Sequence, residues 1–223
     1  RGLTTMGAAT FISNGLGGLF WFYMASLMGT EGYGQVSYFI AIAVIGSRIS
    51  LLGFANTMMV YSAKGVKIQP PIYLIAILGS VITSLILFFV FLYDAGLSLY
   101  VIGFVTFTLV TSDLLGRKQY KTYAKYLISQ KIILIILAVC LYHAIGLTGV
   151  ILGIAISFLP YSFMIYKEFK NTKIDFSLIR SRAKFVTNTF ANDLSELFGG
   201  YLDKLIVAPM LGFALLGNYQ LGI

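Results

Sequence analysis

The chain has 223 residues, of which 58% are hydrophobic and only 11% are charged. Soluble domains carry about 25% charged residues, so a chain this poor in charge is not a water-exposed globular domain, and lipid must surround much of it. The net charge of +8 leaves two interpretations, nucleic-acid binding and membrane topology, which the positions of the basic residues separate.

Long apolar segments follow one another from the start of the chain. We expect helices over residues 3–28, 35–61, 72–93, 97–115, 128–143, 147–166 and 185–211. Most have the length of about 20 residues that crosses the hydrocarbon core of a bilayer. Stretches such as residues 81–92 are apolar on every face, which excludes the alternating pattern of a membrane β-barrel strand. The sequence therefore predicts an all-α, polytopic helical membrane protein.

Lysine and arginine gather in alternate connections between these helices. The connections after the first, third and fifth helices contain neither residue. Those after the second, fourth and sixth contain Lys64, Lys67, Arg117, Lys118, Lys121, Lys125, Lys131, Lys167, Lys170, Lys173, Arg180, Arg182 and Lys184. This alternation follows the positive-inside rule and predicts a multi-pass protein of the cytoplasmic membrane with a cytoplasmic amino terminus. It explains the net charge without nucleic acid as a partner and points to membrane lipids instead.

The predicted helices divide into two groups. Residues 1–166 form a six-helix transmembrane lobe, residues 167–184 a cytoplasmic linker, and residues 185–223 the start of a second lobe, with a seventh helix and the beginning of an eighth. In the linker, Ile174, Leu178 and Ile179 have helical spacing, so we expect either a short amphipathic helix on the inner leaflet or a solvated connection. Because the chain opens on Arg1 and ends inside a new segment, we expect it to be a fragment.

A weak repeat relates the two groups. Gly17, Gly29 and Gly34 recur at Gly200, Gly212 and Gly217, each 183 positions further on. The repeated glycines lie at the outer ends of helices, just before new ones. If the repeat is real, its unit is six helices, and two copies are related by an axis along the membrane normal.

Two stretches carry a resemblance to a known family. The first is Gly29-Thr30-Glu31-Gly32-Tyr33-Gly34, followed by a long helix that ends near Leu51-Leu52-Gly53-Phe54. The second is Tyr201-Leu202-Asp203-Lys204-Leu205-Ile206-Val207, then Leu211-Gly212 and Leu216-Gly217-Asn218-Tyr219. Together they resemble the Wzx-type polysaccharide flippases of the multidrug/oligosaccharidyl-lipid/polysaccharide exporter superfamily.

The resemblance implies about 12 to 14 helices in two six-helix lobes around a central cavity. Such a transporter flips polyprenyl-linked oligosaccharide across the cytoplasmic membrane for cell-surface polysaccharide synthesis. Two alternatives stay open. One is a cation-coupled multidrug exporter of the same superfamily. The other is a membrane-embedded glycosyltransferase or polymerase, which would need acidic residues in larger outer loops than the few residues found here.

Arg48 is the most unusual residue of the second predicted helix. An arginine at mid-membrane costs about 2.5–3.5 kcal/mol on the insertion scale, so it is expected to face a cavity or a partner. It could bind the phosphates of a lipid-linked sugar, with Asn56 and Asn14 as further substrate-binding residues. Alternatively, Arg48 pairs with an acid such as Asp193 or Glu196, and Asn14 hydrogen-bonds across helices.

The seventh predicted helix carries a polar stripe. Asn188, Asn192, Glu196, Gly199 and Asp203 fall on one helical face, with Asp193 beside it. Oxygen ligands of this kind suit a hard cation or a proton, which predicts coupling to Na⁺ or H⁺. The alternative is a set of structural contacts that hold the lobes together.

The sequence lacks the motifs that are typical of several functional classes. The chain has no nucleotide-binding loop, no nucleophile elbow and no Cys/His set with metal-ligand spacing. Cys140 is the only cysteine, which excludes an internal disulfide. We therefore expect that the protein is not an enzyme and has no catalytic residues and no metal site. The only cofactor that we expect is a coupling ion.

Overall fold

The computed structural model describes residues 2–91, 94–171 and 174–222. The structure is 91% helical and the described residues contain no strand, which confirms the predicted all-α class. Five described helical segments are long and apolar enough to cross a membrane: Thr4–Leu51, Gln69–Val90, Ala95–Gly116, Tyr120–Ile145 and Leu147–Tyr166. The protein is therefore a helical membrane protein.

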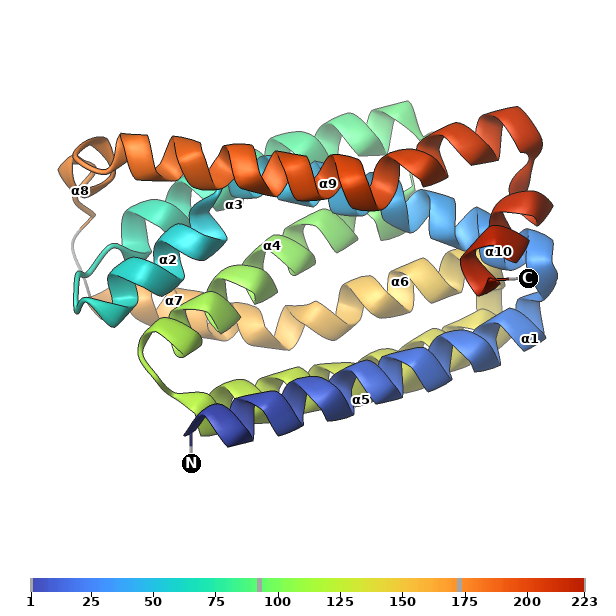
Figure 1. The fold of residues 1–223 in the computed structure, drawn as a ribbon, viewed down its shortest axis with the longest axis horizontal. Helices are drawn as coiled ribbons and strands as arrows, with labels where there is room; N and C mark the ends of the chain where they lie inside the picture. The colour runs from blue at the N-terminus through green and yellow to red at the C-terminus, as the bar shows by residue number, and fades with distance from the viewer. Residues whose placement is uncertain (1, 92–93, 172–173, 223) are drawn as a thin grey trace.

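Helix α1 (Gly2–Leu51) consists of two limbs that meet at Gly29. Gly29 has φ 71° and ψ 174°, a conformation that L side chains rarely adopt. The chain reverses there, so the second limb runs back beside the bundle (Figure 1). The limbs, residues 2–28 and 30–51, correspond to the first predicted helix and most of the second.

The second predicted helix is broken, which corrects the continuous helix expected over residues 35–61. Helix α2 (Phe54–Ala63) starts after Leu52 and Gly53, which both have positive φ. Gly53 lies against α9 (Ala183–Leu211), and a Cβ there would be 2.5 Å from the Phe190 amide nitrogen. The Gly53 carbonyl accepts hydrogen bonds from the hydroxyls of Thr57 (3.0 Å) and Thr189 (3.1 Å). The break therefore provides the close contact between α2 and α9.

The next helices complete the first lobe. Helices α3 (Gln69–Val90) and α4 (Ala95–Gly116) match their predictions within a few residues, although Tyr93 lies outside the described residues. Helix α5 (Tyr120–Ile145) begins eight residues before the predicted start at residue 128. The predicted helix over residues 147–166 divides into α6 (Leu147–Phe158), the 3₁₀ turn η1 (Leu159–Tyr161) and α7 (Ser162–Asn171). Pro160, which lacks an N–H, lies in that turn.

The predicted linker over residues 167–184 includes the end of α7, the short helix α8 (Ser177–Arg180) and the first residues of α9. Leu178 and Ile179 pack against an apolar cluster built on α2, α3 and α4. The apolar side chains of these two residues therefore contact the first helices of the bundle. Before α8, hydrogen bonds from Ser177 lower the pKa of Asp175. Helix α9 confirms that the seventh predicted segment is helical, although it is not among the five segments above that are apolar enough to cross a membrane. Helix α10 (Phe213–Leu221) follows it.

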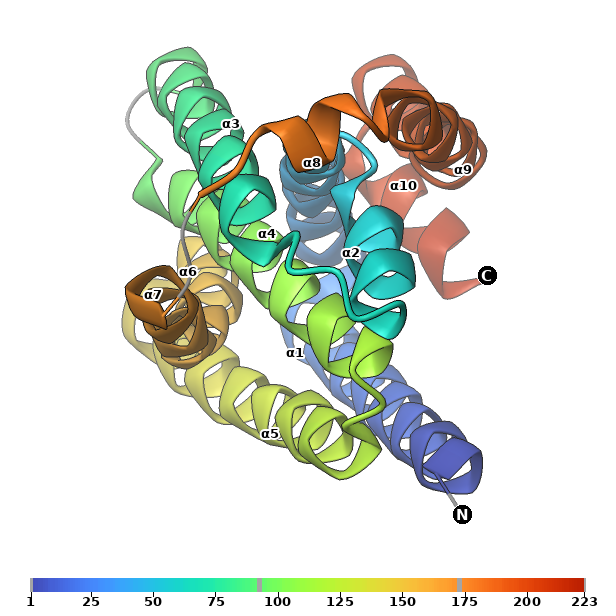
Figure 2. The same cartoon turned by 90° about the vertical axis from the view of Figure 1, so that its left-hand side faces the viewer.

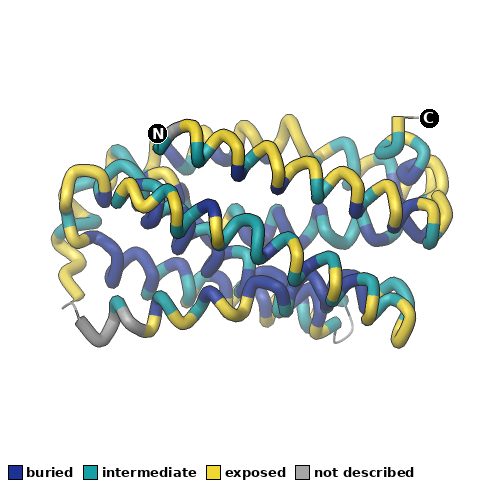
Figure 3. The backbone as a smooth tube through the Cα atoms, turned by 90° about the horizontal axis from the view of Figure 1, so that it is seen from below, coloured by how far each residue is buried: buried dark blue, intermediate teal, exposed yellow. Residues whose placement is uncertain are grey.

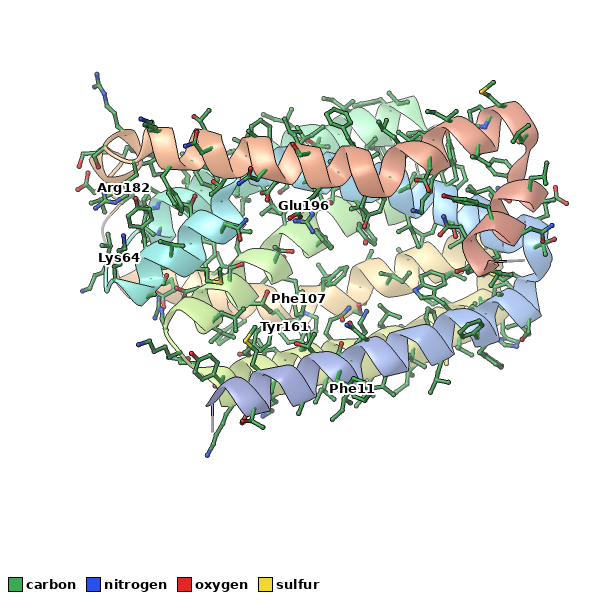
Figure 4. The ribbon with its side chains drawn as sticks, in the orientation of Figure 1. Phe11, Lys64, Phe107, Tyr161, Arg182 and Glu196 are labelled. Carbon is green, nitrogen blue, oxygen red and sulfur yellow. The ribbon has the colours of Figure 1, made fainter. Side chains whose placement is uncertain are left out.

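The connections that contain lysine and arginine lie at one end of the bundle, and the other connections lie at the opposite end. The amino terminus, the α2–α3 connection and α8 lie at one end, and the α9–α10 junction lies at the other (Figures 1 and 2). The first, basic end includes Lys64 and Arg182, which both lie over the ring of Tyr61 (Figure 4). Figure 3 shows that buried and exposed positions alternate along the long helices. Exposed apolar side chains such as Phe11 and Phe89 suit contact with lipid.

Two glycines of the repeat make reciprocal contacts between α1 and α10. A Cβ on Gly34 would overlap the carbonyl oxygen of Phe213, and a Cβ on Gly217 would overlap that of Thr30. Phe213 follows Thr30 by 183 positions, the offset that also separates Gly217 from Gly34. Such reciprocal contacts between equivalent residues are expected where two segments are related by a two-fold axis.

The bends that precede these contacts have the same geometry. Gly212 has φ 87° and ψ 163°, close to the values at Gly29. The α1 bend and the α9–α10 junction are thus two copies of one local structure, and this likeness supports the repeat of 183 residues.

Candidate functional site

A cavity of about 570 Å³ lies among α1, α4, α5 and α6, with one residue of α9 at its edge. Both limbs of α1 contribute to its wall. The lining residues are Ser13, Asn14, Trp21, Ile40, Val44, Arg48, Tyr100, Phe104, Phe107, Thr108, Thr111, Leu127, Gln130, Lys131, Leu134, Ile154, Phe158 and Tyr201. None of them is a carboxylate.

Two cations line this cavity, and neither forms a salt bridge with a described residue. Arg48 lies on the second limb of α1 and Lys131 on α5. Among the described residues, every ion pair within 4.0 Å involves Arg117 or Lys204 instead. A charged group within a membrane protein is stabilised by water, by hydrogen bonds or by an opposite charge. The cavity therefore favours water or an anion.

The position of Lys131 differs from the sequence prediction. The sequence pattern places it, with Lys121 and Lys125, in the basic connection before the fifth helix, but the structure puts all three in α5, with Lys131 near its middle. Its amine reaches toward α1, where a Cβ on Gly17 would lie 3.7 Å from Nζ. A signal was present in the sequence, because Lys131 falls inside the predicted helix and is directly followed by Ile132 and Ile133.

Aromatic rings and neutral polar groups form the rest of the wall. Phe107 packs edge-on against Tyr161 with ring centroids 5.0 Å apart, as Figure 4 shows near the centre of the bundle. Gln130 donates a hydrogen bond of 2.9 Å to Ser157, which fixes its position. Tyr100 stacks on Phe104. The wall thus combines apolar ring faces with amide and hydroxyl groups, and both can contact a sugar.

The structure separates the three predicted substrate-binding residues. Asn14 lines the cavity with Arg48. Asn56 does not, because the break at Leu52–Gly53 directs the start of α2 toward α9. Its side-chain amide instead donates to Asp193 Oδ1 at 3.3 Å.

The polar stripe on α9 faces away from the first lobe. Asn188, Asn192 and Glu196 are exposed, and nothing described lies within 4 Å of where a Cβ on Gly199 would be. Figure 4 shows Glu196 near the middle of α9. Asp203 is half-buried, and its Oδ1 lies 3.7 Å from the Lys204 amine. The stripe is therefore continuous, but it does not join the cavity.

Asp193 lies apart from that stripe, on the buried side of α9. It is 3% exposed, and its Oδ2 has no hydrogen-bond partner among the described residues. Asn56, its partner through Oδ1, is in the first turn of α2, so the carboxylate faces the positive end of that helix. The alternative ion pair between Arg48 and Asp193 is not formed within 4.0 Å, although the two charges are close enough to interact.

A second polar cluster closes the basic end of the first lobe. Asp113 is fully buried on α4 and accepts hydrogen bonds from Ser62 (2.7 Å) and Gln69 (2.9 Å). Its other oxygen pairs with Arg117 at 2.9 Å, and Arg117 also pairs with Glu168 of α7 at 2.9 Å. Burial would lower the pKa of Arg117, but the two carboxylates outweigh it and raise that pKa. The cluster ties the ends of four helices together.

Comparison with known proteins gives no assignment. No protein-family model, no curated protein and no solved structure matches the chain. Within the described part of the chain, no three His, Cys, Asp or Glu side chains gather as ligands for a metal ion. The functional argument therefore depends on the cavity and its charges.

Proposed function

We propose that the protein flips a polyprenyl-linked oligosaccharide across the cytoplasmic membrane, with Arg48 and Lys131 as the residues that bind its phosphate groups. The observation that carries the proposal is the carboxylate-free cavity with two unpaired cations. Guanidinium and ammonium groups are the side chains that proteins use for phosphate. An anionic lipid-linked sugar satisfies both cations.

The dimensions and wall of the cavity agree with such a substrate. A volume of about 570 Å³ is within the usual range of about 300–1,000 Å³ for small-molecule sites. Asn14, Gln130 and Thr108 offer hydrogen bonds to hydroxyl groups, while Trp21 and Phe104 offer apolar faces. A diphosphate with its first sugars fits this combination.

The cation-coupled drug exporter is the weaker candidate. Its organic cations would enter a cavity whose only charges are positive. At a separation of about 4 Å and an effective dielectric constant near 20, two like charges repel by about 4 kcal/mol. The cavity thus disfavours the substrates of that class.

We assign ion coupling to Asp193 rather than to the exposed stripe. Its buried Oδ2 has no hydrogen-bond partner among the described groups and is available for a proton or a Na⁺ ion, and the Asn56 amide holds the other carboxylate oxygen. Because Asp193 joins α9 to α2, a change in its charge alters the contact between the two lobes. Asp193→Asn should abolish the dependence of transport on the ion gradient. Transport that keeps its full ion dependence in this variant would refute the assignment.

The primary test is flipping of a polyprenyl-diphosphate oligosaccharide by the complete protein in proteoliposomes. Arg48→Ala and Lys131→Ala should each weaken substrate use roughly ten- to a hundredfold, as expected for one lost hydrogen bond to a charged group. Lys125→Ala is the matched control, because Lys125 is an exposed lysine on α5 that does not line the cavity. Equal losses in all three variants, or export of an organic cation with no sugar lipid moved, would overturn the proposal.

A further inference from the structure

An elongated groove runs along the seam between the first limb of α1 and the start of α5. It consists of two adjoining hollows of about 380 and 670 Å³, which share Thr5 and Lys121. The groove is separate from the central cavity, since no residue lines both. Asp193 also lies outside the groove.

The larger hollow has an apolar wall of fixed length. Ala8, Ala9 and Ile12 of α1 face Ala124 and Ile128 of α5. From Thr4 to Ile12, the first and last α1 residues of this hollow, the helix rises about 12 Å at 1.5 Å per residue. One leaflet is half of the roughly 30 Å hydrocarbon thickness of a bilayer, so the hollow covers most of the depth of one leaflet.

The smaller hollow lies at the basic end and is distinguished by two lysines. Lys118 and Lys121 line it together with Thr122 and Gln119, and neither hollow is lined by a carboxylate. Lys118 has φ 57°, a conformation uncommon for a residue other than glycine, and its side chain is exposed. The ring of Tyr120 packs on Gly2, which closes the hollow toward the amino terminus. The positive charges of Lys118 and Lys121 therefore lie next to the apolar wall of the larger hollow.

We propose that this groove binds one anionic phospholipid of the basic-side leaflet, with an acyl chain along α1 and α5 and the phosphate between Lys118 and Lys121. The charge complements the headgroup and the length matches the chain. The site goes beyond the proposed function and does not depend on it. A lipid held there would brace the seam between α1 and α5, whose other side forms part of the cavity wall.

The test is native mass spectrometry of the complete protein released from micelles that contain phosphatidylglycerol or phosphatidylcholine. One phosphatidylglycerol molecule should be retained in preference to phosphatidylcholine, and glycerol phosphate should not compete for it. Lys118→Gln/Lys121→Gln should weaken retention roughly thirtyfold, at about 1 kcal/mol for each lysine. Lys64→Gln/Lys67→Gln removes the same charge from the same end outside the groove and should leave retention unchanged.

A second variant tests the apolar part without changing charge. Ala8→Trp fills the channel and should abolish retention, while exposed Ala63→Trp on α2 should not. Equal retention of both phospholipids, equal loss in the two lysine pairs, or retention unchanged by Ala8→Trp would each overturn the proposal. Displacement of the phospholipid by equimolar polyprenyl phosphate would also overturn it, because the groove would then belong to the substrate. Failure of the flipping assay leaves these readouts unaffected.

Discussion

The reciprocal glycine contact between α1 and α10 predicts a defined loss of stability. In Gly34→Ala the added methyl meets the backbone carbonyl of Phe213, and in Gly217→Ala it meets that of Thr30. Neither neighbour is the end of a flexible side chain, so the helices must move apart. Overpacking of this kind costs about 1–3 kcal/mol, and close helix contacts in membranes depend on small residues.

The assay is thermal unfolding of purified protein in one detergent. For a chain of this length, each kcal/mol lowers Tm by roughly 2–4 °C, so each variant should lose between about 2 and 12 °C. The double variant should lose less than the two single losses together, because one separation of α1 from α10 relieves both overlaps. The effects of residues that share a contact are rarely additive.

A matched control separates packing from helix propensity. Gly199 on α9 and Gly7 on α1 are helical glycines with no described atom within 4 Å of an added Cβ. Alanine is about 1 kcal/mol more favourable than glycine within a helix, so these variants should keep or raise Tm. If Gly34→Ala and Gly217→Ala behave like Gly199→Ala, the reciprocal contact is not present in the folded protein.

Three further predictions concern the break, the basic end and the cavity. Gly53→Ala should lower Tm more than Gly65→Ala, since both glycines have φ near 75° but only Gly53 contacts α9; equal losses would leave backbone strain as the only cause. Arg117→Ala should lower the free energy of unfolding by about 2 kcal/mol, because it leaves Asp113 buried without its cation. Adding Asp113→Asn should recover part of this loss. If the losses of the two single variants simply add in the double variant, the pairing is contradicted. Trp21 is the only tryptophan and lines the cavity, so its fluorescence should change when a diphosphate-linked sugar binds; the same change in Arg48→Ala/Lys131→Ala would place the ligand elsewhere.

The sequence by itself determined the class of protein and the ends of the bundle. Charge is scarce and the apolar segments are long, so helices that satisfy their own backbone groups in lipid are the expected outcome. The alternation of basic connections predicted two chemically different ends, and the structure has them. The repeat of 183 residues was also readable, because positions that need glycine for a bend or a close approach keep it in both copies.

Only the tertiary structure decided which polar groups meet. Helical spacing placed Asn188, Asn192 and Glu196 on one face, but it could not say whether that face points inward, and in the structure it does not. The break before α2 brings Gly53 into close contact with α9, residues 130 or more positions away, and it directs Asn56 toward Asp193 instead of the cavity. Lys131 joins Arg48 because α5 packs beside α1, a contact between distant segments that no local pattern encodes.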